Sequence, residues 1–120
     1  MNMEVGPETD ELVAVHVMGW HREHAGIQDP PDPDLDYWTD DSGKILVWCV
    51  LWKPSVNIAQ AWIGVDKMMN EAWMFEIHTS QGYHYIEIVR FDEGVRTRLN
   101  IDAPTMPLAI CRALLNARMA

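Results

Sequence analysis

The chain has 120 residues, the length of one domain, and 48% of them are hydrophobic, which excludes disorder as its main state. Its 18 acidic residues against 9 basic ones give a formal net charge of −9, and this balance argues against binding to nucleic acid. No apolar run is long enough to span a bilayer, so no membrane association is expected.

The first predicted element is a helix over about 10–18. Thr9 and Asp10 offer N-cap chemistry, apolar residues follow at helical spacing, and Gly19 supplies a stop. The next segment, about 21–44, breaks every periodic pattern with three of the seven prolines and a series of aspartates. Those aspartates are Asp29, Asp32, Asp34, Asp36, Asp40 and Asp41. Because proline removes donors and like charges repel, this acidic arm is predicted to be a long loop or a poorly ordered segment.

The run "ILVWCVLW" (45–52) has no period and is rich in β-branched and aromatic residues, which is typical of a buried strand. An amphipathic helix follows, with Ser55 or Asn57 as its cap and apolar residues at helical spacing up to Met69. Three alternating segments then predict a hairpin meander, and a last helix is expected from about Thr105 or Pro107. This order predicts a single domain over 1–120 of class α+β, a layered α/β sandwich with a mostly antiparallel sheet packed by about three helices.

The register of the meander depends on its two connecting loops. If 80–82 and 92–94 are both three-residue loops, alternation creates an apolar face and a polar face. The apolar face, expected to be core, holds Trp73, Phe75, Ile77, Tyr85, Val89, Phe91, Val95, Leu99 and Ile101, with Glu87 and Thr97 as exceptions. The polar face holds Met74, Glu76, His78, His84, Ile86, Ile88, Arg90, Arg96, Arg98 and Asn100. This register places Glu76 and Glu87 on opposite faces, so no catalytic carboxylate pair is expected.

Three stretches together carry a family resemblance: "LVAVHVMGW" (12–20), "KPSVNIAQAWIGVDKM" (53–68) and "APTMPLAICRALLNA" (103–117). Val-Met-Gly-Trp, Pro-Ser before a helix with Ala-Trp, and a closing Ala-Ile-Cys-Arg-Ala resemble the phage ABA sandwich domain family of small phage and prophage proteins. The resemblance covers about a third of the chain, and the long acidic arm departs from it. It implies a layered α/β fold and a phage origin, and it implies no reaction.

The sequence offers little catalytic or metal chemistry. His16, His21 and His24 straddle a helix stop and do not share a face, so no metal site and no cofactor are expected there. No nucleophile, base and orienting group can be assembled, so the protein is not expected to be an enzyme. Cys49 and Cys111 lack ligand spacing and are expected to be unlinked, slowly reacting thiols, which with a phage origin predicts the host cytoplasm.

Tryptophans divide into two groups in this interpretation. Trp48, Trp62 and Trp73 fall on apolar faces and are predicted to pack in the core. Trp38 lies with Tyr37 in the polar acidic arm and is therefore expected, more than the other three tryptophans, to contact a ligand or partner.

Half of the six arginines fall on the polar face of the meander, where Arg90 opposes Arg96 and Arg98 lies two residues further along. Like charges across a ladder need compensation. One candidate is the acidic arm folding over them as a lid. The other is an anionic ligand, a cyclic nucleotide or an ADP-ribose-derived signal, bound by these arginines with His84 and His78 and stacked on Tyr37 or Trp38.

Two functions follow from these alternatives. The first is a non-catalytic anti-defence sponge that sequesters a nucleotide-type immune signal and works as a homodimer or higher homo-oligomer. The second is an acidic inhibitor whose aspartate-rich arm imitates DNA phosphates and binds a host or defence protein.

Overall fold

The computed structural model of the whole chain describes residues 3–25, 35–92 and 95–119, with the backbone alone for 91–92 and 95–97. The elements in chain order are α1 (Pro7–Leu12), η1 (Val13–Val17, π-helical), β1 (His21–His24), β2 (Asp36–Thr39), β3 (Ile45–Trp48), η3 (Cys49–Leu51, 3-10), α2 (Ile58–Met69), β4 (Trp73–Ser80), β5 (Tyr83–Asp92), β6 (Val95–Ala103) and α3 (Met106–Met119). Both sheets are antiparallel, with strand orders β1-β2-β3 and β4-β5-β6. The predicted α+β class is confirmed.

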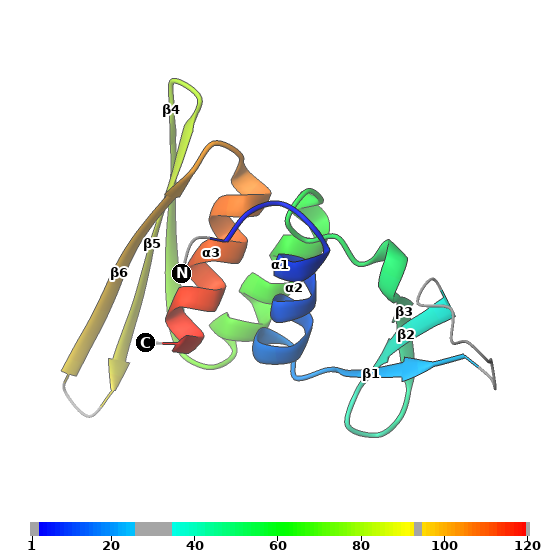
Figure 1. Cartoon of the computed structure of the whole chain (residues 1–120). Helices are drawn as coiled ribbons and strands as arrows, with labels where there is room; N and C mark the ends of the chain where they lie inside the picture. Colours follow the sequence, from blue (N-terminus) through cyan, green and yellow to red (C-terminus); the bar gives the residue numbers. More distant parts are fainter. Residues whose placement is uncertain (1–2, 26–34, 93–94, 120) are drawn as a thin grey trace.

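The helices lie between the two sheets (Figure 1). α3 packs along β5 and β6, α2 and η1 pack on α3, and the small β1–β3 sheet projects from the far side of the helices. The long β4–β6 sheet therefore has one face on the helices and one face away from them. This division decides where each meander side chain goes.

The first helical segment begins earlier than predicted. Pro7 occupies the first turn of α1, and Gly6 takes the N-cap position with φ 144°, so Thr9 and Asp10 lie inside the helix rather than at its cap. The helix ends near Gly19 (φ 71°), as predicted, and Trp20 then packs against Trp52 with ring centroids 4.6 Å apart and the ring planes tilted by 59°. The chain is thereby turned from α1 and η1 toward the small sheet.

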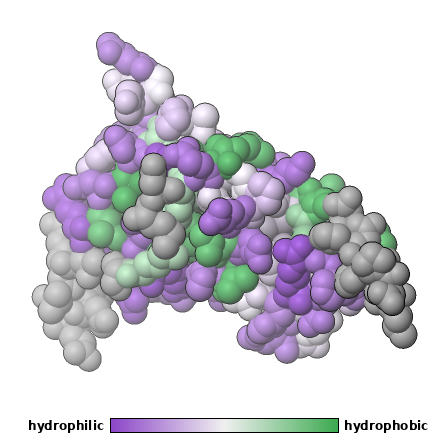
Figure 2. Space-filling view, viewed as in Figure 1, coloured by the Kyte–Doolittle hydropathy of each residue, from purple (hydrophilic) through white to green (hydrophobic). Residues whose placement is uncertain are grey.

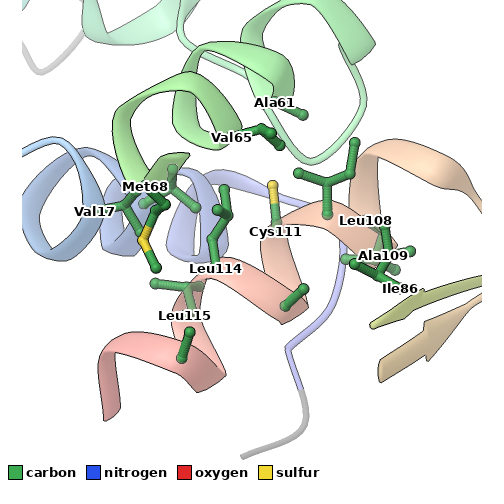
Figure 3. Packing of buried hydrophobic residues seen from close by; sticks show 14 of the residues in the cluster. Val17, Ala61, Val65, Met68, Ile86, Leu108, Ala109, Cys111, Leu114 and Leu115 are labelled. Carbon is green, nitrogen blue, oxygen red and sulfur yellow. The ribbon is translucent and has the colours of Figure 1, made fainter. Parts of the chain in front are cut away.

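The core is built on α3 and the inner side of α2 (Figure 3). Leu108, Cys111 and Leu114 are at most 2% exposed, and Ala61, Val65 and Met68 of α2 pack against them. Asn57 caps α2 by accepting a hydrogen bond of 3.1 Å from the backbone N–H of Gln60, as predicted. A methyl at Gly64 would lie 2.6 Å from Cδ1 of Leu114, so this glycine permits the close approach of α2 to α3.

The segment 21–52 differs most from its prediction. The acidic arm contributes two strands, β1 and β2, rather than a continuous loop; of its aspartates, Asp29, Asp32 and Asp34 lie outside the described residues. The run 45–52 is a four-residue edge strand followed by the 3-10 turn η3, not a buried strand, and Ile45 is 62% exposed. Trp48 and Trp62, predicted in the core, are both exposed, whereas Trp73 is buried as predicted.

The register of the meander is shifted by one residue from the prediction at each connection. Ser80 pairs with Tyr83 and Asp92 with Val95, so each connection has two residues instead of three. Gln81 (φ 47°) and Gly82 (φ 81°) are both left-handed, which is the geometry of a tight two-residue hairpin turn.

A one-residue shift inverts a strand's faces, so the central strand is turned over. Ile86 and Ile88 are fully buried on the helix side, whereas the predicted Tyr85 and Val89 lie on the outer face, where Val89 is still buried at 7% exposure. For β6 the two shifts cancel, and Leu99 packs on the core while Arg98 is exposed, as predicted.

Candidate functional site

A cleft of about 590 Å³ lies where the start of α1 meets the small sheet. Its lining residues are Val5, Gly6, Pro7, Asp10, Glu11, Arg22, Trp38, Cys49, Val50, Trp52, Lys53, Ser55 and Val56. Pockets for small molecules have volumes of about 300–1,000 Å³ and combine mostly apolar walls with a few polar groups. The cleft has both properties. Its volume lies within this range, and only four of its lining residues carry a charge.

One wall of the cleft is fixed by hydrogen bonds between α1 and the chain after η3. The indole N–H of Trp52 donates to the carbonyl of Asp10 over 3.0 Å, and the backbone N–H of Ser55 donates to Oδ1 of Asp10 over 2.8 Å. The N–H of Gly6 in turn donates to the hydroxyl of Ser55 over 3.1 Å. Burial raises the pKa of Asp10, and the hydrogen bonds from Ser55 oppose this increase only in part.

The opposite wall is organised by the carboxylate of Asp36, whose side chain is only 2% exposed. Nε of Arg22 donates to its Oδ2 over 2.6 Å, and Nδ1 of His24 contacts its Oδ1. Burial alone would raise the pKa of Asp36, but these hydrogen bonds and the nearby positive charges outweigh it and hold the pKa below the ordinary value of 3.8. Asp36 therefore stays ionised and fixes Arg22 at the cleft.

Lys53 and Glu11 complete the polar lining. Glu11 lies 3.5 Å from Nη1 of Arg22, and its side chain is half exposed. Lys53 follows Trp52 directly and is exposed, so its ammonium group is accessible at the cleft. Cys49 also lines the cleft, and burial raises the pKa of its thiol, which is therefore protonated at neutral pH. The chemistry that this set supports is binding by apolar contact and by charge.

The predicted arginine cluster is not formed. In the observed register Arg90 pairs with Thr97, on the helix side of the sheet, and its guanidinium carbon lies 5.7 Å from the ring centre of Trp73. Arg98 lies on the opposite face. Arg96 pairs with Phe91, so the predicted Arg90–Arg96 opposition is wrong. The physical reason is the shorter turn, which moves Arg90 to the other side of β5.

The outer face of the long sheet carries a mixed charge instead. Glu76 and Glu87 are directly opposed in the ladder, so their predicted separation onto different faces is wrong. Arg98 binds both oxygens of Glu87, with its Nε 2.8 Å from Oε1 and its Nη2 2.9 Å from Oε2. Such a bidentate contact engages the guanidinium with a carboxylate of the same sheet.

The other predicted ligand residues are dispersed. His78 lies on the outer face, with Nε2 3.3 Å from Glu76, whereas His84 contacts Thr79 over 3.1 Å on the other face. Tyr37 packs edge-on against Trp48 in the small sheet, far along the chain from both histidines.

Trp38 is buried at 2% exposure, contrary to its predicted external contact, yet it lines the cleft. Of the seven predicted residues, it alone belongs to the described cleft lining. The other lining residues were missed, although Lys53 and Ser55 fall within the family-like stretch 53–68. Contacts such as those from Trp52 and Ser55 to Asp10 join positions 42 and 45 residues apart, so they left no local pattern to find.

The three N-terminal histidines have different environments. His21 lies 2.8 Å from the carboxylate of Asp41, His24 contacts Asp36, and the exposed His16 lies in η1. Within residues 3–25, 35–92 and 95–119, no group of three or more His, Cys, Asp or Glu is placed to hold a metal ion. None of the helices in that part of the chain is long and apolar enough to cross a membrane.

Comparison with known proteins identifies the family. The sequence model of the phage ABA sandwich domain matches residues 11–115, nearly the whole chain. Searches of curated proteins and of solved structures gave no match. The chain therefore belongs to the phage ABA sandwich domain family.

Proposed function

We propose that this phage ABA sandwich domain protein is a non-catalytic binding protein that sequesters a nucleotide-type immune signal in the cleft between α1 and the β1–β3 sheet. The observation that carries the proposal is the cleft itself, which has the volume of a small-molecule pocket and mostly apolar walls. The cleft takes the place of the arginine face as the ligand site, because Arg90 and Arg98 lie on opposite sides of the long sheet.

The lining provides one partner for each part of a nucleotide. Val50 and Val56 offer apolar surface for a base, Lys53 offers an ammonium for a phosphate, and Glu11 offers carboxylate oxygens for ribose hydroxyls. Arg22 adds positive charge, and its bond to the buried Asp36 fixes its position in advance. Preorganisation of this kind lowers the entropic cost of binding.

Sequestration fits this lining better than turnover. Cys49 is the thiol in the cleft, and the burial that raises its pKa makes it a poor nucleophile. None of the described lining residues is a histidine that could act as its base. A protein that binds without turnover can still lower the free concentration of a signal, provided that it is abundant and binds tightly.

The alternative function, an acidic inhibitor that imitates DNA, receives less support. Asp36 is buried, and the carboxylate of Asp40 accepts hydrogen bonds from the backbone N–H groups of Ser42 and Lys44 within a turn. These two carboxylates are thereby engaged in contacts within the chain and do not form part of a row of free charges.

The test is thermal denaturation followed by calorimetry with ADP-ribose, a cyclic dinucleotide and a cyclic trinucleotide. A ligand at a hundred times its Kd stabilises a protein by about 2.7 kcal/mol, which gives a clear rise of the midpoint. Chromatography of the ligand released by heat should recover it unchanged.

Variants of two lysines then locate the site. Lys53→Met should weaken binding by roughly tenfold to a hundredfold, since a hydrogen bond to a charged group contributes about 1.5–3 kcal/mol. Lys44→Met, which removes a lysine that does not line the cleft, is the matched control and should leave the Kd within about twofold. Equal binding by the two variants, or conversion of the ligand, would contradict the proposal.

A further inference from the structure

The small sheet ends in an exposed apolar edge. Within the described residues β3 pairs with β2 alone, so its other edge offers backbone N–H and C=O groups for pairing. The four residues of β3 are all apolar, Ile45, Leu46, Val47 and Trp48, and three of them are exposed. Proteins ordinarily protect such edges with charged residues, proline or a covering element, and β3 has neither a charged residue nor proline.

The exposed apolar surface extends from β3 into the next two elements. Of the sixteen exposed large hydrophobic residues in the described part of the chain, nine fall within 45–63, which we call the apolar segment. They are Ile45, Leu46, Trp48, Val50, Leu51, Val56, Ile58, Trp62 and Ile63. Figure 2 shows hydrophobic surface over the region that η3 occupies in Figure 1.

The parts of the apolar segment are held together by one side chain. The amide of Gln60, in the first turn of α2, donates to the carbonyl of Leu51 over 2.8 Å and accepts from the N–H of Lys53 over 2.6 Å. η3 is thereby fixed beside the start of α2. The exposed residues of η3 and those at the start of α2 are therefore neighbours.

The distribution of acidic residues along the chain indicates which partner this surface fits. The chain carries 18 acidic residues, but residues 43–65 contain none of them and hold two lysines, Lys44 and Lys53. Two molecules with a net charge of −9 repel each other over most of their surfaces. The apolar segment is the stretch through which they can approach without bringing carboxylates together.

We propose that the apolar segment, apart from Val50 and Val56 of the cleft lining, is the interface of a homodimer, in which β3 of one copy pairs antiparallel with β3 of a second copy. A two-fold axis brings the same patch of both copies together, so an apolar edge meets an apolar edge. The pairing joins the two small sheets into one continuous sheet and occupies the free backbone groups of β3.

The size of the surface is sufficient for a stable dimer. Without Val50 and Val56, which line the cleft, the other seven large residues are each roughly half exposed and offer on the order of 700 Å² per copy, taking ~200 Å² for a fully exposed large residue; a standard interface buries about 600–1,000 Å² per partner. A dimer that covers these seven residues therefore reaches the standard size and leaves the cleft open.

Sedimentation velocity and light scattering of the purified full chain test the proposal. The wild type should have twice the mass of the 13.8 kDa chain at micromolar concentration. The double variant Ile45→Lys/Leu51→Lys places charges at two exposed positions and should sediment as a monomer at the same concentration. Met74→Lys, at a residue 53% exposed on β4, is the matched control and should remain dimeric.

Leu51→Lys alone gives a second readout if the double variant fails to fold, and it should raise the dissociation constant of the dimer at least tenfold. A monomeric wild type would overturn the proposal and would indicate that the apolar segment binds a different partner. A dimer that all three variants leave intact would also overturn it. Neither Ile45 nor Leu51 lines the cleft, so nucleotide binding is measured independently of this outcome.

Discussion

Asp36→Asn tests whether the buried carboxylate organises the cleft. The carboxylate, 2% exposed, accepts from Arg22 over 2.6 Å and is contacted by Nδ1 of His24. An amide has one acceptor oxygen, so its NH₂ group must face one of these two donors. The variant loses one hydrogen bond to a charged group, about 1.5–3 kcal/mol, and weakens the attraction to Arg22, so we expect a total loss of about 2–4 kcal/mol at pH 7.

The measurement is urea denaturation followed by tryptophan fluorescence, from which the free energy of unfolding is obtained at each pH. Asp41→Asn is the control, because Asp41 forms its contact with His21 at a side chain that is 92% exposed. An exposed pair contributes little, so the control should lie within about 0.5 kcal/mol of the wild type.

The pH dependence follows from the lowered pKa of Asp36. A carboxyl whose folded pKa lies below its unfolded value of 3.8 contributes stability above pH ~4, and this contribution is lost as the pH falls through the folded pKa. The wild type should therefore lose more stability than Asp36→Asn below pH 3.8, and the two should converge. A difference under about 0.5 kcal/mol at pH 7, or a gap that stays constant down to pH 3, would refute the assigned role.

Two further predictions test the register and the thiols. Ile88→Ala should cost about 2–4 kcal/mol in urea denaturation, because Ile88 is fully buried against the helices; a loss below about 0.5 kcal/mol would instead favour three-residue loops. In the native protein Ellman's reagent should modify the half-buried Cys49 before Cys111, since burial leaves Cys111 without exposed surface and raises the pKa of its thiol. Equal and rapid modification of both cysteines would contradict the packing of α3.

The sequence by itself determined the elements that rely on local chemistry. Asn57 caps α2, the apolar stripe from Ala61 to Met68 predicts its buried side, and the two long hairpins follow from alternation and turn residues. The family was identified from three short stretches, and the family model confirms it over residues 11–115. Cys49 and Cys111 are unlinked, as their spacing predicted. In each case, neighbours within a few residues carry the signal.

The tertiary structure decided the register, the exposure of the apolar segment and the cleft. Ser80-Gln81-Gly82 is compatible with a loop of two or of three residues, and only the left-handed conformation of Gln81 selects the shorter one and turns β5 over. An apolar run such as 45–52 does not indicate whether another element covers it. The cleft joins Asp10 to Ser55 and Arg22 to Asp36, and contacts between such distant positions form only when whole elements pack, because no periodicity along the chain encodes them.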